Sequence, residues 1–192
     1  GTLLCLCMLL TLLPVNALAA ETVSSGSCGS NLTWELDSDG TLTISGTGEM
    51  NYYNTPWESN RSEIKKVILK NGVTSICREA FYGCSSLTSV MIPNSMTSIE
   101  SDAFGACDNL KEVHITDIAA WCKITFERSK SNPLYYAHNL YVNGTLVTDL
   151  VIPNSVTSIG SRAFYNCSSL TSVTIPNSVT SIGDGAFWGC TS

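Results

Sequence analysis

The sequence has few aromatic and few charged residues: aromatic side chains make up 8% and charged side chains 14% of its 192 residues. Basic residues are the scarcer sign, with ten Lys and Arg against 16 Asp and Glu, and they form no stripe along the chain. Nucleic acids and anionic membrane surfaces are bound by clustered basic side chains. The composition therefore predicts no nucleic-acid partner.

Motifs for catalysis and metal binding are also scarce. The chain contains two histidines, His114 and His138, no C-x-x-C pair and no Gly-rich phosphate loop. Cys122 is the thiol nearest to them in sequence, and a Cys-His pair would need the fold to bring the two together. We therefore expect no enzyme activity, no cofactor and no metal.

Long apolar runs are absent after the first twenty residues. Residues 3–13 are almost entirely apolar, and Pro14 and the A-x-A pattern of Ala17 and Ala19 follow. This core is too short for a membrane helix of about 20 residues, but it suits a secretory signal peptide. We predict a signal peptide over residues 1–20, truncated at its start because no Met or basic segment precedes it, and hence a secreted or cell-surface protein with no membrane span in this fragment.

Hydroxyl residues and acids are what the rest of the chain has in excess. Ser and Thr make up nearly a quarter of the 192 residues and hydrophobic residues 44%, which is typical of a β-rich globular protein. Six acids and no Lys or Arg lie between residues 21 and 58, whereas residues 61–192 carry ten of each sign. The net charge of −6 therefore belongs to the N-terminal segment.

The strongest signal is an internal repeat of 23 residues. Four blocks align without a gap: Ile64 to Ser86, Leu87 to Asn109, Val147 to Ser169, and Leu170 to Ser192. Between the second and third lies a 37-residue stretch, Leu110 to Leu146, which opens in register and is irregular over 116–146. Such a period predicts a solenoid in which each unit buries its apolar side only against its neighbours.

Each repeat begins as a strand with apolar residues at its first, fourth and sixth positions, as in Leu170, Val173 and Ile175. Pro and Asn then turn the chain, a second short extended piece follows, and the A-F-x-x-C segment is expected to form one helical turn. The sequence thus predicts a β-rich leucine-rich-repeat solenoid of short strands and short helical turns with an N-terminal β-hairpin cap.

Stacked repeats should place identical residues in continuous ladders. One ladder would contain Phe81, Phe104, Phe164 and Phe187, and the other would contain Cys84, Cys107, Cys167 and Cys190 as buried free thiols. The pairing of Cys28, Cys77 and Cys122 stays open.

The repeat V-x-I-P-N-S-V-T-S-I-G-x-x-A-F-x-x-C-S-S-L resembles the BspA-type (Treponema-type) leucine-rich repeat of bacterial and some protist surface and secreted proteins. The lead-in from Cys28 to Gly48 is similar to the segment that precedes such repeats in surface proteins of gut Firmicutes. The resemblance implies partner binding or adhesion outside the cell. One departure is the usual Asn or Cys slot after the strand, which holds Gly72, Ser95, Ser155 or Ser178.

Two segments depart from the repeat. Residues 21–63 are expected to cap the first coil with a hairpin around Asp37 to Gly40, or, as an alternative, to offer a sugar platform of Trp34, Tyr52, Tyr53 and Trp57. The insert is expected to hold a short helix after Thr116 or Asp117 and a hairpin around Asn143-Gly144, serving as packing or as a recognition element.

The outward strand positions are the predicted binding face for an extracellular protein or glycan. They form one sheet face across the repeats, and the candidate contacts lie on its early strands and on the insert: Lys65, Lys66, Lys111, Glu112, His114, Trp121, Tyr135 and Tyr136. We therefore expect a non-enzymatic adhesion or protein-binding module. The alternative is a spacer, carrier or glycan-binding region of a larger surface enzyme that continues beyond Ser192.

Overall fold

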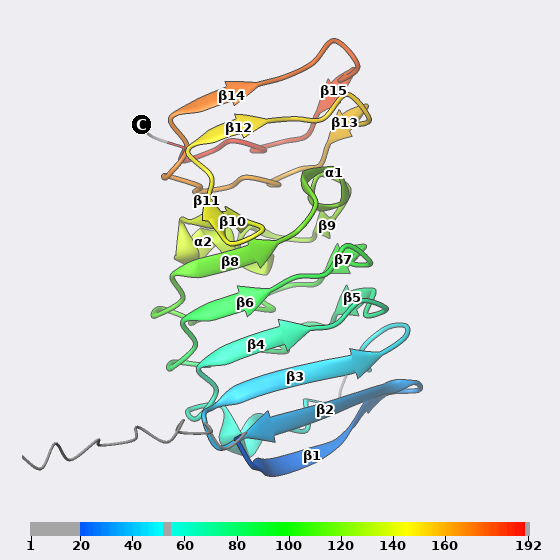
Figure 1. Ribbon diagram of the computed structural model, residues 1–192, viewed down its shortest axis with the longest axis vertical. Helices are drawn as coiled ribbons and strands as arrows, with labels where there is room; N and C mark the ends of the chain where they lie inside the picture. The colour runs from blue at the N-terminus through cyan, green and yellow to red at the C-terminus, as the bar shows by residue number, and fades with distance from the viewer. Residues whose placement is uncertain (1–19, 52–54, 191–192) are drawn as a thin grey trace, which may run out of the picture.

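A computed structural model describes residues 20–51 and 55–190 and shows a solenoid whose coils stack along one axis (Figure 1). The predicted signal peptide lies outside the described residues, except for its last residue. Within the described ranges, no helix is long and apolar enough to cross a membrane.

The main sheet runs along the stack and has eight strands in the order β1-β2-β3-β4-β6-β8-β10-β11. The cap supplies the antiparallel strands β1 (Thr22–Gly29), β2 (Leu32–Asp37) and β3 (Thr41–Gly46), of which β2 and β3 form the predicted hairpin and β1 was not predicted. Strand β3 then pairs in parallel with the first repeat strand, so the cap continues the sheet. The remaining members are β4 (Lys66–Leu69), β6 (Ser89–Met91), β8 (Glu112–Ile115), β10 (Leu140–Val142) and β11 (Thr145–Leu146).

The second extended piece of each coil forms a narrower sheet at the edge of the solenoid (Figure 1). It contains β5 (Ser75–Ile76), β7 (Ser98–Ile99) and β9 (Thr125–Phe126). The last two coils pair only with each other, through β12 (Asp149–Val151) with β14 (Ser172–Thr174) and β13 (Ser158–Ile159) with β15 (Ser181–Ile182). The predicted single sheet face across all repeats is therefore wrong, because the sheet is divided after β11.

Strand β4 alternates as the repeat predicts, with Val67 and Leu69 buried on either side of the outward Ile68. In the last coil, however, the predicted inward residues Val173 and Ile175 are 38% and 40% exposed. The A-F-x-x-C segment, however, is a series of turns and not a helical turn. The fourth residue of the segment has a positive φ, which is 70° at Gly83, 55° at Ala106 and 59° at Asn166, and a right-handed helix does not allow such angles. Alternate N–H groups, those of Glu79, Phe81 and Gly83, donate instead to carbonyl oxygens of the next coil.

The insert forms a coil of its own. Helix α1 (Ile118–Trp121) begins after Asp117, whose Oδ1 accepts hydrogen bonds from two backbone N–H groups, and the predicted hairpin is β10 and β11. Helix α2 (Leu134–Ala137) was not predicted, and two 3₁₀ turns lie at Glu58–Asn60 and Ser129–Ser131.

Because this coil separates the second and third regular repeats, the Phe and Cys ladders are not continuous. Phe81 stacks on Phe104 with 5.3 Å between ring centroids, and Phe164 stacks on Phe187 at 5.2 Å. In the described chain, no ring contact joins Phe104 to Phe164.

Two tryptophans make the same hydrogen bond beside these two stacks. The indole N–H of Trp57 donates to the carbonyl oxygen of Ala80 at 2.8 Å, and that of Trp121 donates to Ala163, also at 2.8 Å. Each acceptor is the Ala that precedes the first Phe of a stack, and Trp57 lies against Phe81 at 5.7 Å. The insert therefore covers the last two coils as the N-terminal cap covers the first.

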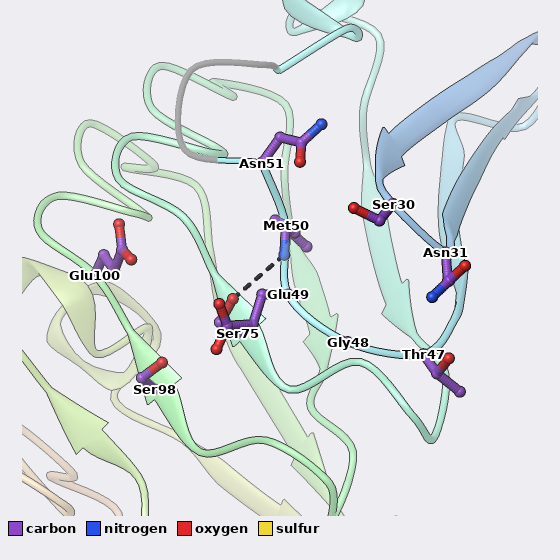
Figure 2. A pocket seen from close by; sticks show the side chains of 10 residues that line it. All are labelled: Ser30, Asn31, Thr47, Gly48, Glu49, Met50, Asn51, Ser75, Ser98 and Glu100. Carbon is purple, nitrogen blue, oxygen red and sulfur yellow. Dashed lines mark hydrogen bonds between the residues drawn. The ribbon is translucent and has the colours of Figure 1, made fainter.

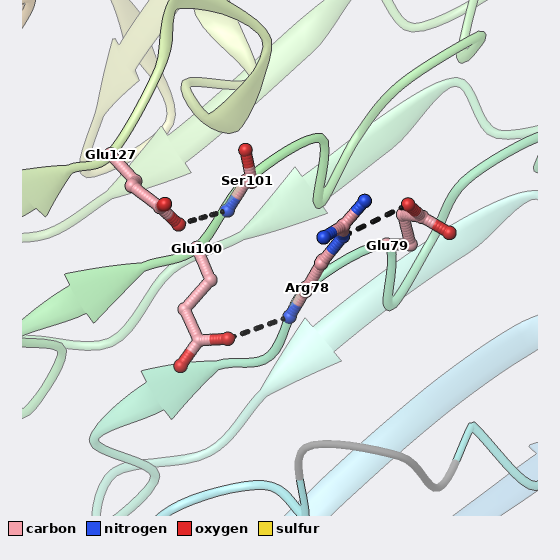
Figure 3. A network of polar contacts seen from close by, with 5 residues as sticks. All are labelled: Arg78, Glu79, Glu100, Ser101 and Glu127. Atoms are coloured by element: carbon pink, nitrogen blue, oxygen red, sulfur yellow. Dashed lines mark hydrogen bonds and ion pairs between the residues drawn. The ribbon is translucent and has the colours of Figure 1, made fainter.

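Hydroxyl and carboxylate side chains join neighbouring coils, and at the position of the usual Asn ladder the contacts come from a serine. The Ser95 hydroxyl donates to the carbonyl of Val73 at 2.7 Å and accepts from the N–H of Gly72 at 2.9 Å. Glu100 accepts from the N–H of Arg78, and Glu127 accepts from that of Ser101 (Figure 3). The high Ser content thus has a structural use, because short hydroxyl side chains satisfy the backbone of the preceding coil.

We predict that replacing Ser95 with Ala lowers the free energy of unfolding by about 1–3 kcal/mol, because both backbone groups that it serves lose their partner. Ser155 occupies the same repeat position but is exposed, and no hydrogen bond of its hydroxyl is found in the described chain. Ser155→Ala should therefore change stability by less than about 0.5 kcal/mol in urea titrations. Equal losses at the two positions would contradict this role of Ser95.

The Phe81→Ala variant should lose about 3–5 kcal/mol, because its fully buried ring lies between Trp57 and Phe104. Phe187 is only partly buried, so Phe187→Ala should cost clearly less. Guanidinium titrations of both variants measure the difference, and a larger loss at Phe187 would argue against the stacking order described above.

Candidate partner-binding face

The outward surface of the main sheet carries a row of mainly apolar side chains that cross it from strand to strand. Backbone pairing places Ile68 beside Met91, Met91 beside His114, His114 beside Tyr141, and Tyr141 beside Leu146. Their strand neighbours on either side, such as Val90 and Ile92, point into the core. We call these five residues the outward row: Ile68, Met91, His114, Tyr141 and Leu146.

The centre of the outward row is held by side-chain contacts. The His114 ring stacks on the Tyr141 ring with 4.8 Å between centroids, and its Nε2 lies 2.9 Å from a carboxylate oxygen of Glu112. Met91 and Leu146 are each 38% exposed although they are apolar. The row is therefore an ordered apolar strip that is open to solvent.

Basic residues lie beside this strip. Lys65 and Lys66 are exposed at the beginning of β4, and Lys111 is exposed just before β8. In the part of the chain that the structure describes, none of the three lies within 4.0 Å of a carboxylate, whereas Glu112 pairs with His114. Five of the eight predicted contacts are thus placed along one sheet face: Lys65, Lys66, Lys111, Glu112 and His114.

The other three predicted contacts are not placed there. Trp121 is 1% exposed, so its prediction as a surface contact is wrong; the insert uses this ring to fill the core. Tyr135 and Tyr136 are partly buried on α2, where the Tyr136 hydroxyl accepts from the N–H of Ala106 at 3.0 Å. Burial raises the pKa of Tyr136. Both tyrosines therefore contact the turn segments and not the outward row.

Sequence reasoning missed Tyr141 and Leu146 as members of this face. They belong to the insert, where the repeat register is lost, and only the parallel pairing of β10 with β8 aligns Tyr141 with His114. The available signal was the Asn143-Gly144 turn, which fixes a hairpin over Leu140 to Val147 but does not say which strand pairs with it.

A polar hollow lies between the loops of the cap and the narrower sheet of β5 and β7 (Figure 2). It has a volume of about 490 Å³, and its lining is almost entirely polar: Ser30, Asn31, Thr47, Gly48, Glu49, Met50, Asn51, Ser75, Ser98 and Glu100. Figure 2 shows Ser75 and Ser98 on one side and Ser30 and Asn31 on the other, with no aromatic ring among the labelled side chains. This groove offers hydrogen bonds but no apolar anchor.

The alternative prediction, a sugar-binding platform in the cap, is wrong with respect to Trp34 and Trp57. Trp34 is 3% exposed and Trp57 is fully buried, so neither ring can stack on a sugar. Tyr52 and Tyr53 lie outside the described residues.

The geometry does not assemble a Cys-His pair. Cys122 is buried, and burial raises the pKa of its thiol to about 12, which opposes formation of a nucleophilic thiolate. His138 is directed to the backbone oxygen of Asn166 at 3.0 Å, and His114 to Glu112. No cluster of three or more potential metal ligands is found among the described residues.

Stacked coils of one strand, one edge strand and a turn segment define a leucine-rich-repeat solenoid. The sequence family described as the BspA type leucine rich repeat region matches in six copies, over residues 59–141 and 135–192. The chain belongs to this family. Membership of this leucine-rich-repeat family suggests a protein-interaction or adhesion module.

The chain also matches solved structures of bacterial leucine-rich-repeat proteins. A leucine-rich repeat protein from Eubacterium ventriosum is 24% identical with a TM-score of 0.42, and the match covers 86% of this chain and 64% of that one. A protein from Bacteroides ovatus is 21% identical with a TM-score of 0.45, over 84% of this chain and 44% of that one. A leucine rich cell surface protein from Faecalibacterium prausnitzii is 22% identical with a TM-score of 0.41, over 88% and 53%. This chain thus spans less than two thirds of each of these proteins. No curated protein matches it.

All seven cysteines in the described part of the chain are free, and all but the partly exposed Cys190 are buried. Burial raises the pKa of the Cys84 and Cys107 thiols to about 12. The Cys107 Sγ also donates to the carbonyl of Phe81 at 3.1 Å. These thiols serve as small core groups, as the sequence predicts for the repeat cysteines.

This burial predicts an alkaline loss of stability. Above about pH 9 the unfolded thiols lose their protons while the folded ones keep them up to about pH 12, so each thiol lowers the unfolding free energy by up to about 1.4 kcal/mol per pH unit. A Cys84→Ala/Cys107→Ala variant should be less stable at pH 7 but show a slope shallower by up to about 2.7 kcal/mol per pH unit. Urea titrations from pH 8 to 10.5 with reductant measure both slopes, and identical slopes would rule out the assigned cause.

Proposed function

We propose that this chain is a non-enzymatic adhesion or protein-binding module of a secreted or cell-surface bacterial protein. Its partner is an extracellular protein that docks on the outward row. The proposal rests above all on one observation, which is the exposure of Met91 and Leu146 in a row that also holds Ile68, His114 and Tyr141. Exposed apolar side chains gathered on one face are typical of interaction surfaces.

The chemistry of the row supports a protein partner over a sugar. Methionine, isoleucine and leucine side chains gain free energy by losing contact with water, so they suit a partner that presents apolar side chains. Tyr141, held flat by the His114 ring, adds an aromatic anchor of the kind that dominates binding energy. Glycan binding and a passive spacer are the rival functions.

The size of the face sets the expected affinity. The outward row and its flanking lysines comprise fewer residues than the roughly 20–30 on each side of a standard interface. We therefore expect weak binding by this fragment, with dissociation constants of about the micromolar range.

Surface plasmon resonance of the purified chain on immobilised extracellular-matrix and mucin preparations tests the proposal. Met91→Glu should weaken binding by about tenfold or more, because it buries a charge in an apolar contact. Val23 on β1 is 55% exposed and lies off the row, so Val23→Glu is the matched control and should bind like the unaltered chain.

Three outcomes would contradict the proposal. Absence of binding to every surface supports a spacer. Mucin binding that is unaffected by Met91→Glu but lost after glycosidase treatment supports a glycan receptor. Equal losses for Met91→Glu and Val23→Glu place the interface elsewhere, and melting curves of both variants exclude unfolding as the cause.

A further inference from the structure

The beginnings of β4, β6 and β8 border a groove that is separate from the outward row. Its volume is about 330 Å³, and it is lined by Lys65, Ser85, Ser86, Thr88, Asn109 and Lys111, to which we refer as the edge groove. Two ammonium groups, three hydroxyls and an amide line it, and none of these side chains is a carboxylate. Nothing in the family repeat requires a lysine at either position, since the corresponding residues of the other blocks are Thr88, Thr148 and Thr171.

The walls of the edge groove are fixed by contacts within the fold. The Thr88 hydroxyl donates to the carbonyl of Lys65 at 3.0 Å, and the Asn109 amide donates to the carbonyl of Ser85 at 2.7 Å. The aliphatic part of the Lys65 side chain lies against Gly40. A Cβ added at Gly40 would be only 3.1 Å from the Cγ of Lys65. These contacts therefore preform the groove, which lies in the turns and connecting residues just before β4, β6 and β8.

The two lysines are spaced to share one anionic group. They occupy the same repeat position two coils apart, and a strand spacing of about 4.8 Å separates their backbones by roughly 10 Å. A carboxylate above Thr88 would thus lie between them. In the described ranges neither lysine lies within 4.0 Å of a carboxylate, and Glu112, the acid next to Lys111, is held by His114 at 2.9 Å.

The surroundings favour a short acidic segment over a long polyanion. Whereas the edge groove is locally basic, the chain as a whole carries a net charge of −6. An extended sulfated or uronic-acid polysaccharide would run from the groove onto this acidic molecule, where like charges repel it. A protein segment can place one or two carboxylates in the groove and direct uncharged side chains elsewhere.

The outward row lies within reach of the same segment. Lys65 directly precedes β4, and Ile68 follows it by three residues, which corresponds to roughly 10 Å of extended chain. We propose that the edge groove binds Asp or Glu side chains of an acidic segment in the partner protein, whose neighbouring apolar side chains contact the outward row. This inference rests on the proposed function and specifies the partner's chemistry.

Selection of a phage-displayed library of random 12-residue peptides tests the inference without a known partner. Three baits are compared: the unaltered chain, a Lys65→Gln/Lys111→Gln variant and Met91→Glu. The unaltered chain should enrich peptides that combine Asp or Glu with apolar or aromatic residues. The double lysine variant should lose the acidic enrichment but keep the apolar one, and Met91→Glu should do the reverse.

A synthetic copy of the most enriched peptide then gives the magnitude. Its affinity should fall by about fivefold in the double lysine variant, as expected for two exposed ion pairs, and it should fall similarly when salt is raised from 50 to 500 mM. Lys123→Gln/Lys130→Gln removes two exposed lysines from the insert and is the charge-matched control. Heparin is included as a competitor.

The outcomes separate the two proposals. Apolar enrichment without acidic enrichment, or acidic enrichment that persists in the double lysine variant, overturns the edge groove while the outward row stands. Binding of heparin that depends on Lys65 and Lys111, without peptide enrichment, overturns the protein partner in favour of a glycan. No enrichment on any bait overturns both.

Discussion

Backbone hydrogen bonding from each coil to the next is the interaction on which the rest of this structure depends. A single coil has too little interior to bury its own apolar side chains, so its strands and turn segments pair with the neighbouring coil. Equal lengths between repeats then bring identical positions into contact, as in the stacks of Phe81 on Phe104 and Phe164 on Phe187. The same register aligns outward side chains, so the outward row arises from the pairing that holds the core together.

The insert shows what happens when that register is broken. Its coil cannot present an A-F-x-x-C segment, and Trp121, Phe126 and Leu134 fill the core in its place. The Trp121 indole N–H satisfies the carbonyl of Ala163, which repeats the contact of Trp57 with Ala80. The insert thus acts as an internal cap for the coils that follow it. It also supplies Tyr141 and Leu146 to the outward row. Packing by the insert is therefore shown by its buried residues, whereas its role in recognition stays a proposal that rests on Tyr141.

Basic side chains are gathered beside the outward row and in the edge groove, whereas the molecule as a whole has a net negative charge. The acids of the N-terminal segment lie mainly on the cap, whereas Lys65, Lys66 and Lys111 flank the repeat strands. Exposed charges are screened over about 8–10 Å, so these lysines act on a partner only at short range. In the proposed binding mode, the apolar row supplies the affinity and the lysines contribute selection among partners.

The sequence by itself determined the repeat unit, because a 23-residue period and alternating apolar positions leave one way to bury Val67, Val90 and Val113 together. It also identified the cap hairpin and the hairpin of the insert, since Asp37 to Gly40 and Asn143-Gly144 are local turn signals. Only the tertiary structure decided that A-F-x-x-C forms turns, that Trp121 is buried, and that Tyr141 lies beside His114. The reason is physical: which groups lie next to one another across coils depends on pairing between distant segments, and no local pattern encodes that pairing where the repeat length changes.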